Sequence, residues 1–137
     1  MPSAQMSSQD REALLAAARA ALKRAHAPYS KFHVGAAVLT DQGEIFSGCN
    51  VENASYGLTN CAERSAIFTA VQGTKADKLK IRAVAVVNGH DVPCSPCGAC
   101  RQVIAEFGEN DVVIFRGQTD YQVMSIHDLL PESFRLS

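Results

Sequence analysis

Helical spacing of apolar residues marks the first part of the chain. From Ser8 to about Ala25, strong helix formers place apolar side chains on one face and arginines and lysines elsewhere. Pro28 ends this segment, because proline cannot continue a helix. Two strand-like runs, Phe32 to Thr40 and Glu44 to Gly48, then flank the turn sequence Asp41-Gln42-Gly43. The pattern predicts a helix followed by an antiparallel hairpin.

Two apolar runs in the second half lack the alternation of a half-exposed strand. IRAVAVVNG, beginning at Ile81, and DVVIF, beginning at Asp111, are nearly continuous, which is typical of strands covered on both faces. Helices are predicted from Cys61 to about Gln72 and over CGACRQVIAEF, where Pro96 occupies the first helical position. This β, α, β alternation predicts parallel strands joined by right-handed crossovers.

The last segment predicts a short strand at Tyr121 to Met124 and a terminal helix. Ser125, with Asp128 three residues later, forms an acidic variant of a capping box. The elements together predict an α/β fold: a three-layer α/β/α sandwich with a mixed five-stranded sheet, its N-terminal hairpin antiparallel and its later strands parallel. The chain of 137 residues has the usual size of one domain and contains no linker or repeat, so we expect residues 1–137 to form a single domain.

Charge and hydropathy exclude several classes of protein. The formal net charge is -1, which provides no extended basic surface, so polymeric nucleic acid is not expected as a partner. The N-terminal apolar stretches are interrupted by Arg19, Lys23 and Arg24, and no basic region precedes them. Neither a signal peptide nor a membrane span is therefore predicted, and we expect a cytoplasmic protein.

Five cysteines suggest a metal site: Cys49, Cys61, Cys94, Cys97 and Cys100. A disulfide framework would leave one unpaired and strain the close ones. Cys97 and Cys100, three apart at a helix start, project from the same side, and a helix N-terminus favours the thiolate that a metal needs. Cys61, at the start of the other helix, gives a third soft ligand. Three such ligands without a redox requirement suit zinc.

A closed structural zinc or iron–sulfur cage that includes Cys94 is the alternative. Cys94 would have to reach round Pro96, and the cage would leave Glu63 without a role. An open zinc position instead lowers the pKa of a bound water towards about 7, and Glu63, two residues after Cys61, can move its protons. Glu63 is otherwise a helix-start acid or a capping-box partner of Asn60.

The charge of such a site draws attention to Arg64. Zinc with three thiolates carries net -1, which disfavours formation of hydroxide compared with a site that has a neutral histidine. Arg64 would withdraw negative charge by donating hydrogen bonds to the ligand sulfurs. A solvated helix arginine is equally consistent with the sequence. The histidines lie outside the metal spacing, at His26, His33, His90 and His127.

The motifs CAE, at Cys61 to Glu63, and PCGAC, at Pro96 to Cys100, resemble the zinc signature of the cytidine deaminase family. The resemblance extends over YSKFHVGAAV, GCNVENASYGLTNCAERSAIF, PCGACRQVIAEF and LLPESF. It implies a hydrolase of cyclic amidine carbon–nitrogen bonds that converts free cytidine and deoxycytidine to uridine and deoxyuridine, with release of ammonia, in pyrimidine salvage. It also implies one zinc per chain, with Glu63 as the proton shuttle.

The resemblance further assigns substrate contacts. It implies that Phe32 lines the base pocket and that Asn50 and Glu52 hold a ribose hydroxyl, which an amide and a carboxylate can do together. Without the resemblance, NVEN is equally a surface loop. The backbone of Ala62 and of Ser95 is implied to contact the pyrimidine.

Subunit contacts are implied as well. By resemblance, Tyr56 and Phe134 lie at subunit boundaries and contribute to a neighbour's site in a homotetramer. Cys49 and Cys94 have no family role that carries over, and we expect small buried side chains. Two other functions fit the same motifs: a deaminase of the same fold that acts on a cytosine-containing nucleoside antibiotic, and a non-catalytic, zinc-stabilised binding module.

Overall fold

A computed structural model describes residues 6–108 and 112–136 of the chain. Its elements follow in the order α1 (Ser8–Leu22), β1 (Val34–Thr40), β2 (Ile45–Cys49), the 3-10 helix η2 (Tyr56–Leu58), α2 (Ala62–Gly73), β3 (Ile81–Asn88), α3 (Gly98–Glu106), β4 (Val112–Arg116), β5 (Tyr121–Ser125) and α4 (Ile126–Leu129). Asp111, the first residue of one predicted strand, lies outside the described residues.

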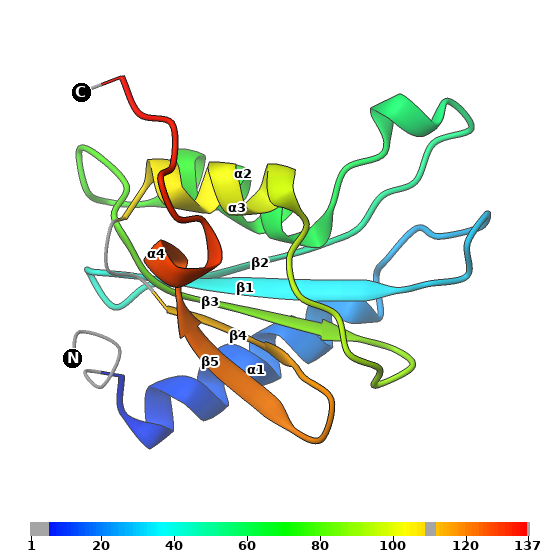
Figure 1. The fold of residues 1–137 in the computed structure, drawn as a ribbon, viewed down its shortest axis with the longest axis horizontal. Helices are drawn as coiled ribbons and strands as arrows, with labels where there is room; N and C mark the ends of the chain where they lie inside the picture. The colour runs from blue at the N-terminus through cyan, green and yellow to red at the C-terminus, as the bar shows by residue number, and fades with distance from the viewer. Residues whose placement is uncertain (1–5, 109–111, 137) are drawn as a thin grey trace.

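The strands form one mixed sheet in the order β2-β1-β3-β4-β5 (Figure 1). β1 pairs antiparallel with both β2 and β3, and β3 pairs parallel with β4. The predicted mixed five-stranded sheet is confirmed. Parallel pairing, however, is limited to β3 and β4, because β5 runs antiparallel to β4. The connection from Arg116 to Tyr121 is too short for the crossover that a parallel pair needs.

Helices cover both faces of this sheet, as the predicted sandwich requires. In Figure 1, α1 lies below the sheet, and α2, α3 and α4 lie above it. Alternate residues of β3 serve the two cores: Val84 and Val86 pack with α2 and α3, whereas Ala83, Ala85 and Val87 pack with α1. This two-sided burial explains why the sequence of β3 is an almost continuous apolar run.

Glycine allows α2 to lie close to the sheet. A Cβ atom at Gly48 on β2 would overlap the backbone nitrogen of Ala66 on α2. Backbone atoms cannot rotate out of the way as a side chain can, so the position requires glycine. The contact fixes the height of α2 above β2, and with it the start of the helix that carries Cys61 and Glu63.

Two predicted helix ends differ from the structure. α1 ends at Leu22 rather than near Ala25, because the chain turns to pair with another segment: His26 N donates to Asn50 O at 3.0 Å. α3 begins at Gly98, so the prediction of Pro96 as its first residue is wrong. Cys97 is the N-cap with extended backbone, φ -67° and ψ 168°, which delays the first helical turn.

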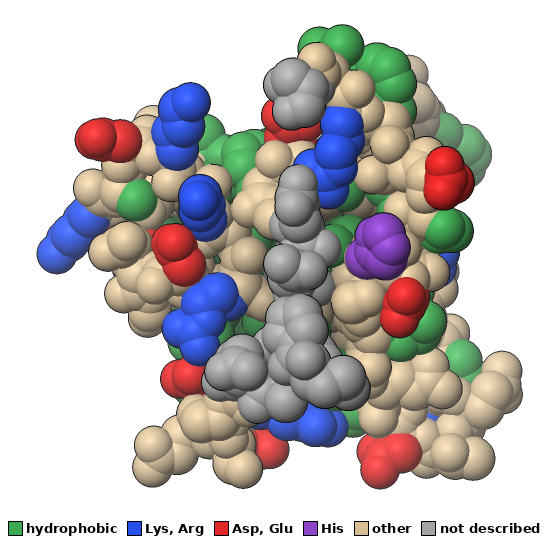
Figure 2. All heavy atoms as spheres, turned by 60° about the vertical axis from the view of Figure 1, so that its left-hand side comes forward, with side chains coloured by type: hydrophobic (Ala, Val, Ile, Leu, Met, Phe, Trp, Pro, Cys, Tyr) green, Lys and Arg blue, Asp and Glu red, His purple; other side chains and the backbone are tan. Residues whose placement is uncertain are grey.

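The Ser125 half of the predicted capping box is confirmed, since Ser125 Oγ accepts a hydrogen bond from Asp128 N at 3.1 Å. Among the described residues, no helix is long and apolar enough to cross a membrane. Lys and Arg side chains are interspersed with Asp and Glu on the face shown in Figure 2. That face therefore carries no extended field of one sign.

Candidate metal centre and active site

The structure brings three cysteines together where α2 and α3 begin, at the same end of the sheet (Figure 1). Cys61 and Cys97 are the N-cap residues of these helices, and Cys100 lies in the first turn of α3. Their Sγ atoms all lie within 4.8 Å of one another. Cys100 is buried and Cys97 is exposed, so the cluster is closed on the core side and open on the other. Three convergent thiols of this kind can hold a soft cation such as zinc.

A shared hydrogen bond within the cluster gives two of its thiols very different pKa values. A hydrogen bond from Cys100 lowers the pKa of Cys61 to about 5, with a further contribution from Arg64 and against the effect of burial. The same hydrogen bond to Cys61, together with burial, raises the pKa of Cys100. Because metal binding displaces thiol protons, a cation held by all three sulfurs would replace this shared proton.

Arg64 contacts the cluster directly. Its Nη2 lies 3.2 Å from Cys61 Sγ, and this hydrogen bond raises the pKa of the guanidinium. Its Nε is buried without a hydrogen-bond partner among the described residues. The interpretation of Arg64 as a solvated helix arginine therefore does not hold. A fixed positive charge beside the sulfurs fits a site that gains negative charge when three thiolates bind a metal.

Glu63 is buried at the start of α2. Only 5% of the residue is exposed, and burial raises the pKa of its carboxyl to about 7. A capping box with Asn60 is not formed: the N-cap is Cys61, and Asn60 Nδ2 donates to Ser65 Oγ at 3.1 Å. Glu63 is therefore a buried acid at the helix start, not a solvated one. Its pKa suits proton transfer near neutral pH.

Cys94 does not join the cluster in the described part of the chain. Its backbone instead forms an isolated bridge with Arg116, in which Cys94 N donates to Arg116 O at 3.0 Å. Burial raises the pKa of its thiol, which favours the protonated form over a ligand thiolate. Cys94 and Cys49 are half-buried, so the expectation of buried side chains was wrong for both. The described residues thus bring three thiols together, not four.

Asn50 and Phe32 are joined through the backbone. Asn50 Nδ2 donates to Phe32 O at 2.8 Å, and Asn50 Oδ1 accepts from Val34 N at 2.9 Å. The Asn50 side chain is buried, and this bridge leaves it one N–H and one lone pair for another partner. Sequence reasoning did not find the bridge, since nothing in the spacing of residues 32, 34 and 50 indicates it.

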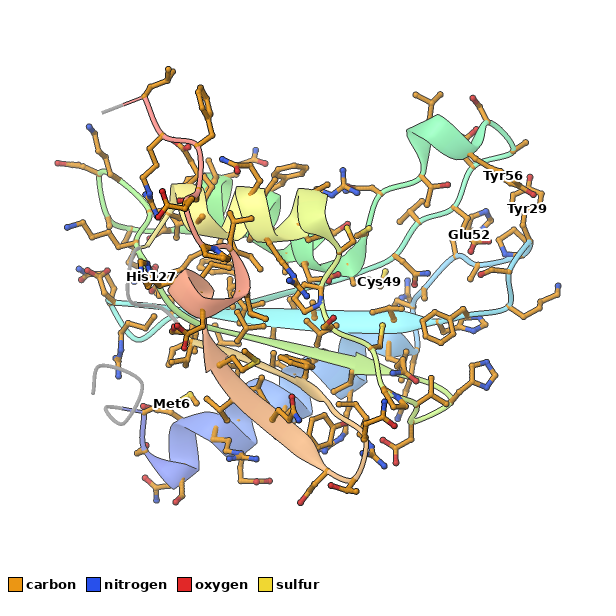
Figure 3. The ribbon with its side chains drawn as sticks, in the orientation of Figure 1. Met6, Tyr29, Cys49, Glu52, Tyr56 and His127 are labelled. Carbon is orange, nitrogen blue, oxygen red and sulfur yellow. The ribbon has the colours of Figure 1, made fainter. Side chains whose placement is uncertain are left out.

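Glu52 also holds the segment that leads to Phe32. Its carboxylate accepts hydrogen bonds from Tyr29 N at 2.9 Å, from Ser30 N at 3.1 Å and from Ser30 Oγ. These bonds, led by the one from the Ser30 hydroxyl, lower the pKa of Glu52. Figure 3 shows Glu52 beside Tyr29, and Tyr29 in turn contacts Tyr56 at the start of η2. Tyr29 and Ser30 were missed from the sequence, because their partner lies more than 20 residues away.

The remaining expected base contacts lie on three different segments. The partly buried Phe32 ring stacks on His90, with ring centroids 5.7 Å apart and planes 13° from parallel. Ala62 is fully buried at the start of α2. Ser95 Oγ accepts a hydrogen bond from Arg101 Nη2 at 3.1 Å, which leaves the Ser95 backbone uninvolved in that contact.

The two residues expected at subunit boundaries are exposed in the single chain. Tyr56 is 77% and Phe134 70% exposed. Tyr56 makes an edge-on contact with Tyr29, with ring centroids 6.4 Å apart. Gln102 Nε2 donates to the Phe134 carbonyl oxygen at 3.0 Å, which anchors that backbone and leaves the ring free.

Known proteins are similar to this one over most of the chain. Residues 8–116 match the model of the cytidine and deoxycytidylate deaminase zinc-binding region. A cytidine deaminase of Sporosarcina psychrophila is 48% identical over 128 residues, 91% of each chain. The crystal structure of a cytidine deaminase from Burkholderia pseudomallei shares the fold with TM-score 0.80 and 49% identity, covering 94% of this chain and 100% of that one.

A blasticidin-S deaminase of Bacillus cereus is also similar, with 34% identity over 107 residues, 74% of this chain and 76% of its own. Its identity and coverage are both lower than those of the cytidine deaminases. Since the family match spans both cysteine segments and the fold agrees over 94% of this chain, the chain belongs to the zinc-binding cytidine deaminase family and is a hydrolytic deaminase.

Proposed function

We propose that this enzyme hydrolyses free cytidine and deoxycytidine to uridine and deoxyuridine, with release of ammonia, as a step of pyrimidine salvage. One catalytic domain spanning residues 1–137 would carry the reaction. The observation that supports the proposal most is the buried Glu63 carboxyl, which burial holds near neutral pKa, two residues from a cluster of three thiols. Deamination of a cytosine ring needs these two parts together: a soft metal site and a proton carrier.

One Zn²⁺ per chain would be held by Cys61, Cys97 and Cys100. The donor set fits, because three soft sulfurs converge and the Arg64 guanidinium is already in place to offset their charge. When bound, zinc supplies a Lewis acid that makes water acidic enough to attack at neutral pH. Arg64 would stabilise the thiolates and so keep the site from becoming too electron-rich.

Glu63 would move two protons during the reaction. It first accepts a proton from the water that attacks C4 and delivers it to N3 of the pyrimidine. It then passes the second proton of that water to the amino group, the bond from C4 to nitrogen breaks, and ammonia leaves. The oxygen of water becomes the new carbonyl oxygen, so the atoms balance. A pKa near 7 lets one carboxyl act as both base and acid.

Substrate recognition would use the groups around the Phe32 segment. The ring of Phe32 would contact the base, and the backbone of Ala62 and of Ser95 would bind its polar edge. Three hydrogen bonds leave Glu52 about one lone pair, and Asn50 keeps one N–H. One hydroxyl can satisfy both groups, because it donates and accepts. A sugar with a single hydroxyl in reach is then sufficient, which supports deoxycytidine as a second substrate.

We further propose that four chains assemble and complete one another's sites. The exposed rings of Tyr56 and Phe134 support this, because aromatic side chains that are more than two-thirds exposed in one chain gain most from burial by a neighbour. The free nucleoside, rather than nucleic acid or a membrane, would be the partner. The mixed charges in Figure 2 and the net charge of -1 support a small-molecule substrate. A cytoplasmic location is part of the same proposal.

The test is the loss of cytidine absorbance together with ammonia release, with and without a zinc chelator. Deaminated cytidine and deoxycytidine, with activity lost on chelation, are the expected results. Turnover of blasticidin S but not of cytidine would assign the enzyme to antibiotics instead. Zinc binding without any ammonia released would indicate a binding module. Free cytosine serves as the control, since it lacks the sugar that Asn50 and Glu52 would hold.

A further inference from the structure

One hydroxyl group connects the two parts of the expected substrate site. Ser30 Oγ donates a hydrogen bond to Glu52 Oε2 and accepts one from Phe32 N at 2.9 Å. Ser30 N adds a second bond to the same carboxylate, at 3.1 Å to Oε1. The hydroxyl therefore lies between the carboxylate expected to hold the sugar and the residue expected to hold the base.

The turn around Ser30 is held both by a local hydrogen bond and by hydrogen bonds to a residue distant in the sequence. Lys31 has φ 62°, in the left-handed region, which a residue with a Cβ atom rarely adopts. The Lys31 amide donates to Ala27 O at 3.1 Å, which is a local hydrogen bond within this turn. Glu52, which follows β2 in the chain, accepts three hydrogen bonds from Tyr29 and Ser30. Its carboxylate therefore holds this turn from outside the local sequence.

Both peptide groups of Phe32 are tied to the residues expected to hold the ribose. Its N–H donates to Ser30 Oγ, which in turn donates to Glu52, and its carbonyl oxygen accepts from Asn50 Nδ2 at 2.8 Å. The Phe32 ring itself stacks on His90. Loss of the Ser30 hydroxyl would leave the Phe32 amide without its partner and would remove one donor from Glu52. The backbone of Phe32 would then be held from one side only.

We propose that Ser30 is a positioning residue that couples sugar recognition at Glu52 to base recognition at Phe32. The proposal rests on the proposed function, because both partners are substrate contacts only if a nucleoside binds there. It differs from a general stabilising role of Ser30. A stabilising serine would change the amount of folded enzyme, whereas a positioning serine changes the affinity of folded enzyme for its substrate.

Two double-mutant cycles on the zinc-loaded enzyme test this coupling. Ser30→Ala is combined with Phe32→Leu and, separately, with Glu52→Gln, and kcat and KM for cytidine are measured. Ser30→Ala alone is expected to raise KM about tenfold with little change in kcat, the size of losing one charge-assisted hydrogen bond. In either second background its further effect should fall to about twofold or less, because the partner through which it acts is already impaired. Equal effects in all backgrounds would overturn the proposal.

Conservative and matched variants complete the design. Ser30→Thr keeps the hydroxyl and should restore KM to near the wild-type value. Ser8→Ala, at the other end of α1 from this loop, removes an exposed hydroxyl and should leave KM and kcat unchanged. A Ser30→Ala enzyme with unchanged KM and a lower active fraction would show a structural role only, which also rejects the proposal.

Amide hydrogen exchange at Phe32 gives a readout that needs no substrate. The Phe32 amide is expected to be protected in the wild type and in Ser30→Thr, and to exchange faster in Ser30→Ala. Equal protection in all three proteins would reject the linkage. Wild-type enzyme that does not deaminate cytidine would reject the proposed function whatever the exchange result, so the two failures are distinct.

Discussion

Burial of Glu63 predicts that its replacement by glutamine stabilises the zinc-free protein, and that this gain grows with pH. Glutamine has nearly the same shape as glutamate but carries no charge. Burial raises the carboxyl pKa of Glu63 from 4.5 to about 7, so the folded protein must accommodate a poorly solvated carboxylate at high pH. The variant avoids that cost.

The magnitude follows from the two pKa values. Between pH 4.5 and about 7 the folded state binds more protons than the unfolded state, so the stability of the wild type falls as pH rises through this window. The favourable contribution is fully present below pH 4.5 and is lost above about pH 7. At about 1.4 kcal/mol for each tenfold change in proton affinity, the advantage of Glu63→Gln is about 1 kcal/mol at pH 5 and about 3 kcal/mol at pH 8.

Urea unfolding at pH 5 and pH 8, with chelator and at equal protein concentration, measures the difference in free energy of unfolding. Glu12→Gln, which neutralises an exposed acid on α1, is the matched control and should show no comparable dependence on pH. A gain from Glu63→Gln that is the same at both pH values would refute the reasoning. A variant less stable than the wild type at pH 8 would refute it as well.

Two other substitutions test the metal site, and a third tests the packing of α2 on the sheet. Arg64→Gln should weaken zinc affinity about 10- to 100-fold in a chelator competition, since the hydrogen bond to Cys61 Sγ is lost; unchanged affinity would show that this contact does not support the metal. Cys94→Ser should retain one zinc per chain by metal analysis, because Cys94 lies outside the sulfur cluster, and loss of zinc would restore the four-cysteine cage. Gly48→Ala should lower the free energy of unfolding by about 1–3 kcal/mol in urea, because its Cβ overlaps Ala66 N on α2; wild-type stability would mean that α2 can shift freely.

The sequence predicted best those features that depend on burial of a single strand or on residues close together in the chain. The unbroken apolar run of β3 has two-sided burial as its direct cause, and the capping pair at Ser125 and Asp128 is local. Element ends were less predictable. α1 ends early because His26 pairs with Asn50, a contact between distant segments that no local pattern contains. The direction of β5 depended on the length of its connection, which the apolar pattern of the strand does not reveal.

In the candidate site, too, residues placed by local spacing could be predicted, whereas contacts between distant segments could not. Cys61, Cys97 and Cys100 could be chosen from their spacing, because helix starts place them predictably. The contact of Arg64 with Cys61 could not, since an arginine at that helical position can equally face solvent. Ser30 was missed because its significance depends on a carboxylate that only the folded chain brings beside it.

The central claim, that Glu63 moves protons at a zinc site made by three cysteines, is tested most directly by Glu63→Gln in the zinc-loaded enzyme. The variant and the wild type are compared for zinc content and for ammonia released from cytidine. Our account predicts one zinc per chain in both proteins and a loss of turnover of at least about 10²-fold in the variant. Turnover near the wild-type rate in a variant with full zinc content would contradict the account.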